Sequence, residues 1–194
     1  MEPFIIFGLG NPGREYEQTR HNIGFIAIDK LSIAWNVDIS RVRYKSLTGE
    51  GKFGENKVIL VKPLTFMNRS GNAVSSFMQF YKIDAARILV IHDDMDLPFG
   101  SLRIREEGGS AGQRGMQSII SKIGSNEFAR LRIGIGRPPG RMDAVDYVLK
   151  KFTEKDQLGL DLVLDSIVRA IETLLTDGIE KAMTLYNHSV LDDD

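Results

Sequence analysis

A polar loop that follows the first apolar run of the sequence could carry out acid–base chemistry. It holds Asn11, Arg20, His21 and Asn22, directly after the buried-strand pattern of residues 4–7. A histidine in a polar loop can act as a general base near neutral pH, and open α/β sheets place their sites at the carboxyl ends of strands. We therefore interpret His21 as a candidate base. The alternative of a surface or helix-capping histidine stays open at this point.

The same loop begins with residues 8–13 (GLGNPG), which match the dinucleotide-binding pattern G-x-G-x-x-G. In such a site a helix opens inside the glycine loop, and an acidic residue about twenty positions later ends the second strand. Here the polar run 14–20 follows the glycines, and Asp29 falls inside a predicted helix. The sequence therefore disfavours a nucleotide site.

Residues 92–96 (HDDMD) follow the third buried strand and resemble a metal-binding cluster of histidine nitrogen and carboxylate oxygens. No other stretch supplies ligands at tight spacing, so we expect no metal. A carboxylate of this turn could instead bind a histidine from the neighbouring strand end and fix its tautomer. For His92 itself we predict a buried strand histidine whose hydrogen bonds are satisfied.

Residues 108–112 (GGSAG) match the nucleophile motif G-x-S-x-G between a predicted strand and a predicted helix. That motif requires an acid and then a histidine later in the chain, and the histidine that follows Ser110 is His188, close to an acidic end. A serine esterase using Ser110 therefore remains a weaker alternative. The milder interpretation is a glycine loop that shapes a substrate or anion entrance before a helix N-terminus.

Alternating strands and helices are expected to position the candidate side chains. Apolar runs and alternation predict strands, and helical spacing of apolar residues predicts helices. The strands are expected at residues 4–7, 57–62, 88–91, 102–105 and 131–135, and the helices at 23–35, 70–81, 113–123, 154–175 and 179–186. This alternation indicates one layered α/β domain with a central sheet over residues 1–190, followed by an acidic tail at 191–194.

Composition narrows the class of protein. The chain has 194 residues, 42% of them hydrophobic, which suits one domain with a packed core. It has no cysteine and no apolar run long enough to span a membrane, and its start lacks a secretion signal. We expect a cytoplasmic protein without disulfides or thiolate metal sites.

The charge is unevenly distributed along the chain. Formal net charge is −1, but residues 100–141 carry eight basic and three acidic side chains, and residues 142–194 carry five basic and twelve acidic ones. A basic middle on a neutral body suggests a local anionic partner. Chance clustering on a solvated surface is the alternative.

Four stretches together resemble the bacterial-type peptidyl-tRNA hydrolase family. They run in order over nearly the whole chain: GLGNPGREYEQTRHN (8–22), KPLTFMNRSG (62–71), HDDMDLPFG (92–100) and LRIGIG (131–136). The resemblance implies one α/β domain whose mixed central sheet is surrounded by helices. It also implies hydrolysis of the ester bond between a peptide, or an N-blocked aminoacyl group, and tRNA.

The resemblance assigns roles residue by residue. His21 would be the catalytic base and Asp93 its carboxylate partner. The other positions carried over are Asn11 and Asn68, which would position substrate and water, Tyr16 and Met67, which would line the site, and Arg105 and Arg132, a basic pair for the tRNA 5′-phosphate. It implies no cofactor, no membrane, no obligate protein partner and a monomer.

One departure concerns the residues after Gly112. The family usually shows His-Asn-Gly there, and this chain has Gln113-Arg114-Gly115. Arginine at 114 lacks the carbonyl acceptor of asparagine but offers a charged fork of donors, so we expect Arg114 to bind the tRNA acceptor end. A non-catalytic RNA-binding relative, similar to splicing proteins of this fold, remains the alternative from another functional class.

Overall fold

The first strand, β1 (Phe4–Gly8), is buried along its whole length because helices cover both faces of the sheet around it. The computed structural model describes residues 2–191. Within it Ile5 and Phe7 pack into one core cluster, and Phe4 and Ile6 into the other. A strand that is covered on both faces appears in a sequence as a continuous apolar run, which explains the pattern at residues 4–7.

The described residues form one mixed sheet of seven strands in the order β2-β3-β4-β1-β5-β7-β6. β1, β4, β5 and β7 run parallel, whereas β2, β3 and β6 pair antiparallel with their neighbours. The strands after β1 are β2 (Arg41–Arg43), β3 (Ser46–Phe53), β4 (Asn56–Pro63), β5 (Ile88–Asp94), β6 (Leu102–Arg105) and β7 (Ala129–Gly134).

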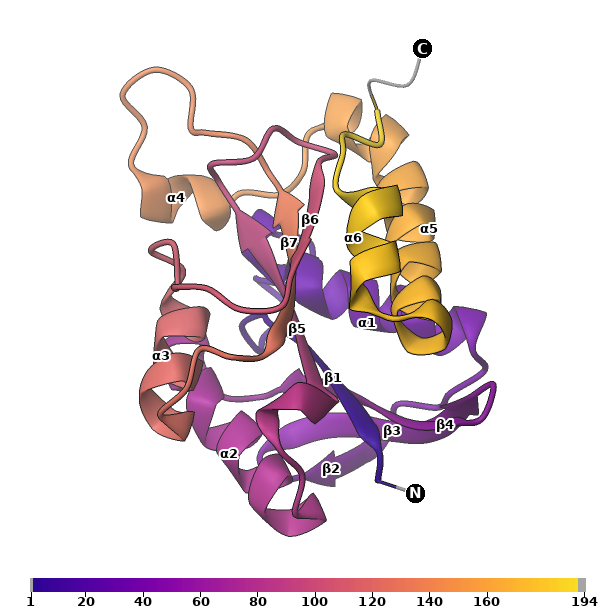
Figure 1. Ribbon diagram of the computed structural model, residues 1–194. Coiled ribbons are helices and arrows are strands. Elements are labelled where there is room, and N and C mark those ends of the chain that lie inside the picture. The colour runs from indigo at the N-terminus through magenta and orange to yellow at the C-terminus, as the bar shows by residue number, and fades with distance from the viewer. Residues whose placement is uncertain (1, 192–194) are drawn as a thin grey trace.

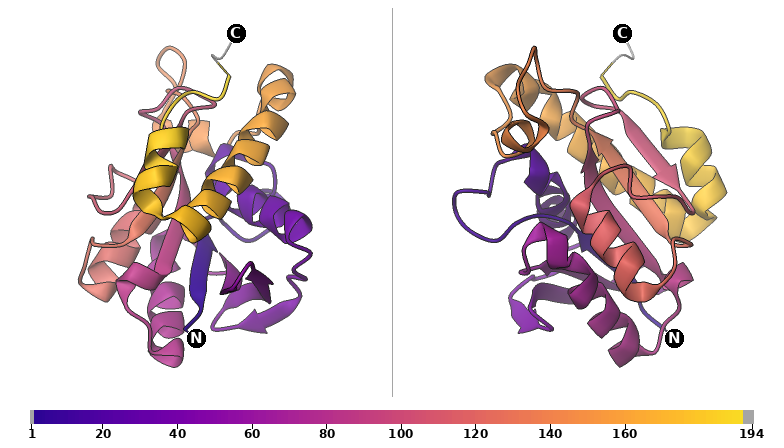
Figure 2. Two further views of the ribbon diagram at one scale, coloured as in Figure 1. Left: turned by 45° about the vertical axis from the view of Figure 1, so that its right-hand side comes forward. Right: turned by 90° about the vertical axis from the view of Figure 1, so that its left-hand side faces the viewer.

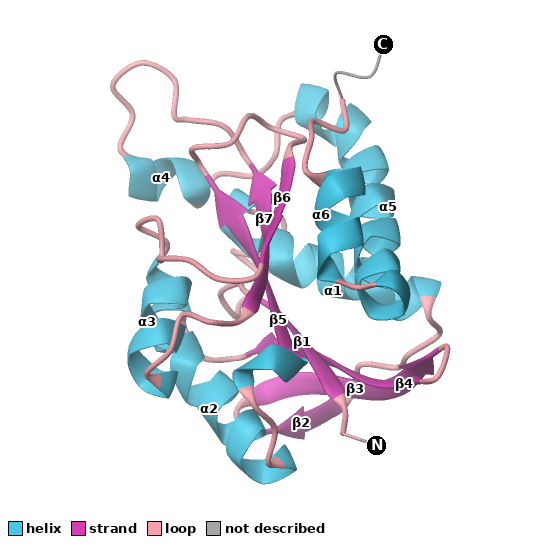
Figure 3. Cartoon of the chain, in the orientation of Figure 1, coloured by secondary structure: helices cyan, strands magenta, loops and turns pink. Residues whose placement is uncertain are grey.

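Helices cover the sheet on two sides (Figures 1 and 2). α1, α5 and α6 lie on one face, α2 and α3 on the other, and α4 lies beyond the carboxyl end of the sheet (Figure 3). Their bounds are α1 (Ile23–Ala34), α2 (Ser70–Tyr81), α3 (Arg114–Ile123), α4 (Ala144–Val148), α5 (Glu154–Asp177) and α6 (Ile179–Tyr186), with 3₁₀ helices η1 (Arg20–Asn22), η2 (Met67–Arg69) and η3 (Ala85–Arg87).

The structure confirms the fold class and every element that the sequence predicts, with small shifts of the ends. β5 is longer than predicted, so Asp93 and Asp94 belong to the strand rather than to a turn after it. No helix in residues 2–191 is long and apolar enough to cross a membrane. Residues 192–194 of the predicted acidic tail lie outside the described part, whereas Leu191 packs against the core.

Among the strands and α-helices, three were not predicted: β2, β3 and α4. β3 reads SLTGEGKF, without an apolar alternation. Its glycines have a steric reason, because a Cβ on Gly49 would lie 2.5 Å from the Asp38 carbonyl oxygen and one on Gly51 would lie 2.4 Å from a Val37 methyl carbon. The glycines of β3 are therefore required by Val37 and Asp38, which pack over the strand, and they interrupt the alternation expected of a strand.

Candidate active site

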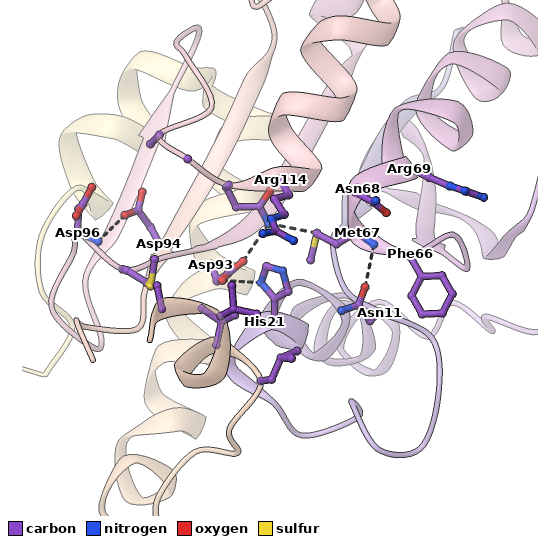
Figure 4. A pocket seen from close by; sticks show the side chains of 18 residues that line it. Asn11, His21, Phe66, Met67, Asn68, Arg69, Asp93, Asp94, Asp96 and Arg114 are labelled. Carbon is purple, nitrogen blue, oxygen red and sulfur yellow. Dashed lines mark hydrogen bonds and ion pairs between the residues drawn. The ribbon is translucent and has the colours of Figure 1, made fainter. Parts of the chain in front are cut away.

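A cavity of about 700 Å³ lies where β1, β4 and β5 end and α3 begins (Figure 4). This is the edge at which α/β sheets bind their ligands. Its walls come from segments far apart in the sequence. The lining residues are Asn11, His21, Phe66, Met67, Asn68, Arg69, Asp93, Asp94, Met95, Asp96, Ala111, Gly112, Gln113, Arg114, Ala144, Val145, Val148 and Leu149.

His21 and Asp93 form the central pair of this cavity. His21 lies in η1, the turn that leads into α1, and Asp93 lies near the end of β5. His21 Nδ1 is 2.8 Å from Asp93 Oδ2, and the two side chains are 13% and 4% exposed. Because a carboxylate accepts, the hydrogen bond assigns the proton to Nδ1 and leaves Nε2 as the basic nitrogen on the cavity side.

The second carboxylate oxygen of Asp93 also has a donor. Gln113 Nε2 donates to Asp93 Oδ1 over 3.1 Å, and Gln113 Oε1 accepts from the Met116 backbone N–H at 2.7 Å. Gln113 is thus the N-cap of α3 and a neighbour of the central pair at once. Both oxygens of the buried carboxylate are therefore hydrogen-bonded, which fixes the orientation of the Asp93 side chain.

Asn11 is held in place by backbone and side-chain hydrogen bonds. Its Oδ1 accepts from the Met67 backbone N–H at 2.8 Å, and its own backbone exchanges hydrogen bonds with the buried Asn22 amide. Since the oxygen is engaged, the amide presents its N–H groups as donors to the cavity. Asn11 can therefore stabilise a negative charge that develops there.

The other candidate residues divide into those that line the cavity and those that do not. Asn68 and Arg114 are exposed residues of the cavity wall, and Met67 is a buried one. Tyr16, which we expected to line the site, does not. Its backbone N–H donates to Gly13 and its carbonyl accepts from Thr19, so Tyr16 belongs to the turn that leads to His21.

Arg20 directly precedes His21 in η1. Its side chain connects η1 to the part of the chain around α4, which forms one wall of the cavity. The guanidinium is 6% exposed, donates to the Lys151 carbonyl at 2.5 Å and to Asp156 at 2.7 Å, and lies 4.6 Å above the Tyr147 ring. These contacts join η1 to α4, to the first turn of α5 and to the segment between the two helices. The apolar wall that α4 supplies is therefore held in a fixed position relative to His21.

Arg105 and Arg132 lie outside the cavity, on neighbouring strands β6 and β7. Arg132 Nε donates to Asp94 Oδ2 at 2.6 Å, and Asp94 does line the cavity. Arg105 is exposed, and within residues 2–191 its side chain has no ion pair or hydrogen bond. The two arginines were predicted as equivalent members of a pair, but they differ in their freedom to bind an anion.

Buried arginine charge adds to the positive potential of this strand pair. Arg130, cross-strand partner of Arg105, is 2% exposed and donates to the carbonyls of Gly108 and Asn126. Burial, followed by repulsion from Arg132, lowers the pKa of Arg130 to about 10. It remains a cation near pH 7 and fixes the glycine loop that precedes α3.

The remaining motif residues, Ser110 and His92, contribute no side chain to the cavity of the central pair. Ser110 lines a separate cavity of about 410 Å³, rather than the cavity that holds His21. His92 is 2% exposed with Nδ1 2.8 Å from the Asp93 carbonyl, which confirms the prediction of a buried, hydrogen-bonded strand histidine, and burial lowers its pKa. Among residues 2–191, no cluster of three or more His, Cys, Asp or Glu side chains could hold a metal ion.

Sequence reasoning missed three contributors to the cavity. Phe66, 57% exposed, Val145 of α4 and Leu149, which follows α4, add apolar surface. Gln113 was noted as a departure but not as a partner of Asp93. The α4 wall has a weak sequence signal, apolar residues at helical spacing in 144–149, whereas the Gln113 contact has none, because residues 20 positions apart meet there.

Comparisons with known proteins agree with the motifs. A family model described as peptidyl-tRNA hydrolase matches residues 5–193. The chain is 49% identical over 185 residues to the peptidyl-tRNA hydrolase of Chloroflexus aggregans, covering 95% of this chain and 98% of that one. It is 47% identical over 186 residues to the chloroplastic peptidyl-tRNA hydrolase of Arabidopsis thaliana, covering 95% of this chain and 65% of that protein's length.

A solved structure extends the similarity to three dimensions. The crystal structure of peptidyl-tRNA hydrolase from Acinetobacter baumannii is similar with a TM-score of 0.90 and 35% sequence identity, covering 97% of each chain. The likeness therefore includes the whole mixed sheet and both helical layers.

Proposed function

The chain belongs to the peptidyl-tRNA hydrolase family, and on that premise we propose that it hydrolyses peptidyl-tRNA in the cavity of His21 and Asp93. The substrate's ester joins a peptide carboxyl group to a ribose hydroxyl, and hydrolysis releases free tRNA for translation. The hydrogen bond between His21 Nδ1 and Asp93 Oδ2 is the observation that supports this site. It leaves one basic nitrogen facing a cavity large enough for an ester and its flanking groups.

His21 Nε2 deprotonates a water molecule as its oxygen attacks the ester carbonyl carbon. Asp93 stabilises the imidazolium that forms, and the same proton passes to the departing ribose oxygen when the tetrahedral intermediate collapses. A base in this role contributes roughly 10²–10⁴-fold. An amide donor to the oxyanion, from Asn11 or Asn68, contributes roughly 10²–10³-fold in analogous sites.

We assign the binding of tRNA to three arginines, two on the β6–β7 strand pair and one at the cavity. We propose that Arg105 and Arg132, on β6 and β7, contact phosphate and that Arg114, in the first turn of α3, contacts the acceptor end. Helix N-termini attract anions, and a guanidinium can donate two parallel hydrogen bonds to phosphate oxygens. Contacts to phosphate carry no base sequence, which suits an enzyme that accepts many tRNAs.

Hydrolysis of an N-blocked aminoacyl-tRNA is the assay that tests this function. The blocked substrate should be cleaved far faster than the free aminoacyl-tRNA, because a cationic amine must lose its hydration to enter a site built from neutral amides. Activity should persist in a metal chelator, since imidazole supplies the base. Equal kcat/KM for both substrates would contradict the substrate assignment, and tRNA binding without any hydrolysis would support the RNA-binding alternative.

We also propose that the enzyme works as a cytoplasmic monomer without a cofactor or an obligate protein partner. The described residues of a single chain supply every wall of the cavity. Sedimentation of the isolated protein with and without tRNA would test this arrangement.

Neutralising Arg105 should weaken tRNA binding more than neutralising Arg132, because Arg132 is already paired with Asp94. Arg105→Gln is expected to raise KM on full-length tRNA and to lower the slope of log K against log salt by about 0.9, the value for one contact to a duplex phosphate. kcat on a minimal CCA-ester should stay unchanged. KM measured across a salt series provides the test.

The matched control is Arg41→Gln, which removes the same charge from an exposed strand at the opposite edge of the sheet. It should leave both KM and the salt slope at wild-type values. Equal slopes for wild type and Arg105→Gln on full-length tRNA would show that Arg105 is an ordinary surface residue.

A further inference from the structure

Gln113 makes contacts that its position at a helix start does not require. It caps α3 by accepting from the Met116 N–H, a task for which Ser, Thr, Asp and Asn are the preferred residues. Its longer side chain also reaches the central pair, where Nε2 lies 3.1 Å from Asp93 Oδ1 and 3.3 Å from Met67 Sδ. The side chain is 9% exposed, so these contacts are shielded from water.

The orientation of the Gln113 amide is decided by its partners. A backbone N–H can only donate, so the amide atom that faces Met116 must be the oxygen. The amide nitrogen therefore faces the Asp93 carboxylate, which can only accept. Packing holds this arrangement, since a Cβ on Gly115 would lie 3.0 Å from Gln113 Oε1 and 2.6 Å from Met67 Sδ.

We propose that Gln113 is a positioning residue of the reaction, which holds the Asp93 carboxylate by donating to Oδ1 and so orients the His21 ring through Oδ2. The inference rests on the roles proposed for His21 and Asp93. Three hydrogen bonds connect these groups in series: the α3 N-terminus to Gln113, Gln113 to Asp93, and Asp93 to His21.

The chemical consequence lies in how the charge of Asp93 is shared. A donor at Oδ1 draws part of the carboxylate's charge away from His21, while Oδ2 still orients the imidazole ring. Because an amide does not titrate in the working range, this donation is the same at every pH. The glutamine that replaces the family's usual histidine thus keeps the donor and removes an ionisation.

Gln113→Met tests the proposal by deleting the donor at nearly constant volume. We expect kcat to fall roughly ten- to hundredfold, the range for a hydrogen bond to a charged group, with KM within about twofold of wild type. The acid limb of the kcat/KM profile should move to higher pH, because the carboxylate's charge then acts more fully on His21. The measurement is the pH dependence of hydrolysis of one N-blocked aminoacyl-tRNA.

Gln113→His supplies a conservative rescue. A neutral imidazole has one acceptor and one donor, which can serve the Met116 N–H and Asp93 respectively. kcat should return to within about threefold of wild type, since the donor to the charged group is restored. The charged neighbours stay the same in every variant: Arg114, Arg69, and Asp94 with its partner Arg132.

Gly124→Ala is the matched control for helix stability. Gly124 ends α3 at φ +71°, where a side chain is strained, and it lies at the end of the helix away from Asp93. Both Gln113→Met and Gly124→Ala should lower Tm, but Gly124→Ala should keep wild-type kcat and the wild-type acid limb. A wild-type profile in Gln113→Met, or the same shift in Gly124→Ala, overturns the proposal.

Failure of the role proposed for Gln113 can be distinguished from failure of the proposed function. If the wild-type protein fails to hydrolyse peptidyl-tRNA, the proposed function fails. If the wild type is active, His21→Asn is inactive and Gln113→Met matches wild type in kcat and pH profile, then this inference alone fails.

Discussion

His21→Asn is expected to reduce kcat for an N-blocked aminoacyl-tRNA by roughly 10²–10⁴-fold, the contribution of a positioned general base. The asparagine amide can still donate to Asp93 Oδ2, so the buried carboxylate keeps a partner and the fold should survive. Tm and the affinity for uncharged tRNA should remain close to wild type, because the cations assigned to tRNA lie elsewhere. Single-turnover hydrolysis and tRNA binding, measured on the same preparation, provide the test.

Ser110→Ala is the control for this experiment. Ser110 lines the separate cavity of about 410 Å³, so its hydroxyl should be dispensable and the variant should retain near wild-type kcat. An active His21→Asn enzyme together with an inactive Ser110→Ala enzyme would replace the mechanism with that of a serine esterase.

Asp93→Asn should be about as damaging as loss of the histidine, although it changes a single oxygen to an NH₂ group. Gln113 Nε2 requires an acceptor, so the new amide must turn its oxygen toward Gln113 and its nitrogen toward His21 Nδ1. His21 Nδ1 then becomes an acceptor and its proton moves to Nε2, the atom that should receive a proton from water. We expect kcat to fall roughly 10³–10⁴-fold, by analogy with the orienting aspartate of a Ser-His-Asp triad.

Asp93→Ala provides the comparison for this tautomer argument. It removes the carboxylate but forces neither tautomer, so it should be at least as active as Asp93→Asn despite its poorer fit to the site. The measurement is kcat for both variants at saturating substrate, with near-ultraviolet circular dichroism as a check on packing. A kcat within about tenfold of wild type in Asp93→Asn would show that the carboxylate does not select the tautomer.

The regular elements of the fold could be predicted because their signals are local. The apolar runs of β1, β4 and β5 and the helical spacing of α1, α2 and α5 depend on how each segment is buried, which its own residues record. β3 was not predicted because its glycines are required by Val37 and Asp38, which pack too closely over it to allow a side chain at those positions. A signal that lies in a neighbouring segment cannot be read from the segment itself.

The sequence by itself determined the class of fold, the family and the side chains that could do the chemistry. His21, Asp93 and Asn11 stand in motifs whose residue types and order are specific enough to identify them. Only the tertiary structure decided which atoms meet: that Nδ1 of His21 faces Asp93, and that Gln113 turns its nitrogen toward the same carboxylate.

The tertiary structure also separated Arg132, which is paired with Asp94, from the exposed Arg105. The physical reason is the range of the interactions. Periodicity and turn chemistry act over a few residues, whereas His21 and Asp93 are 72 positions apart and meet through the packing of a helix and a strand. Hydrogen-bond direction and burial are set by that packing, and no local pattern carries them.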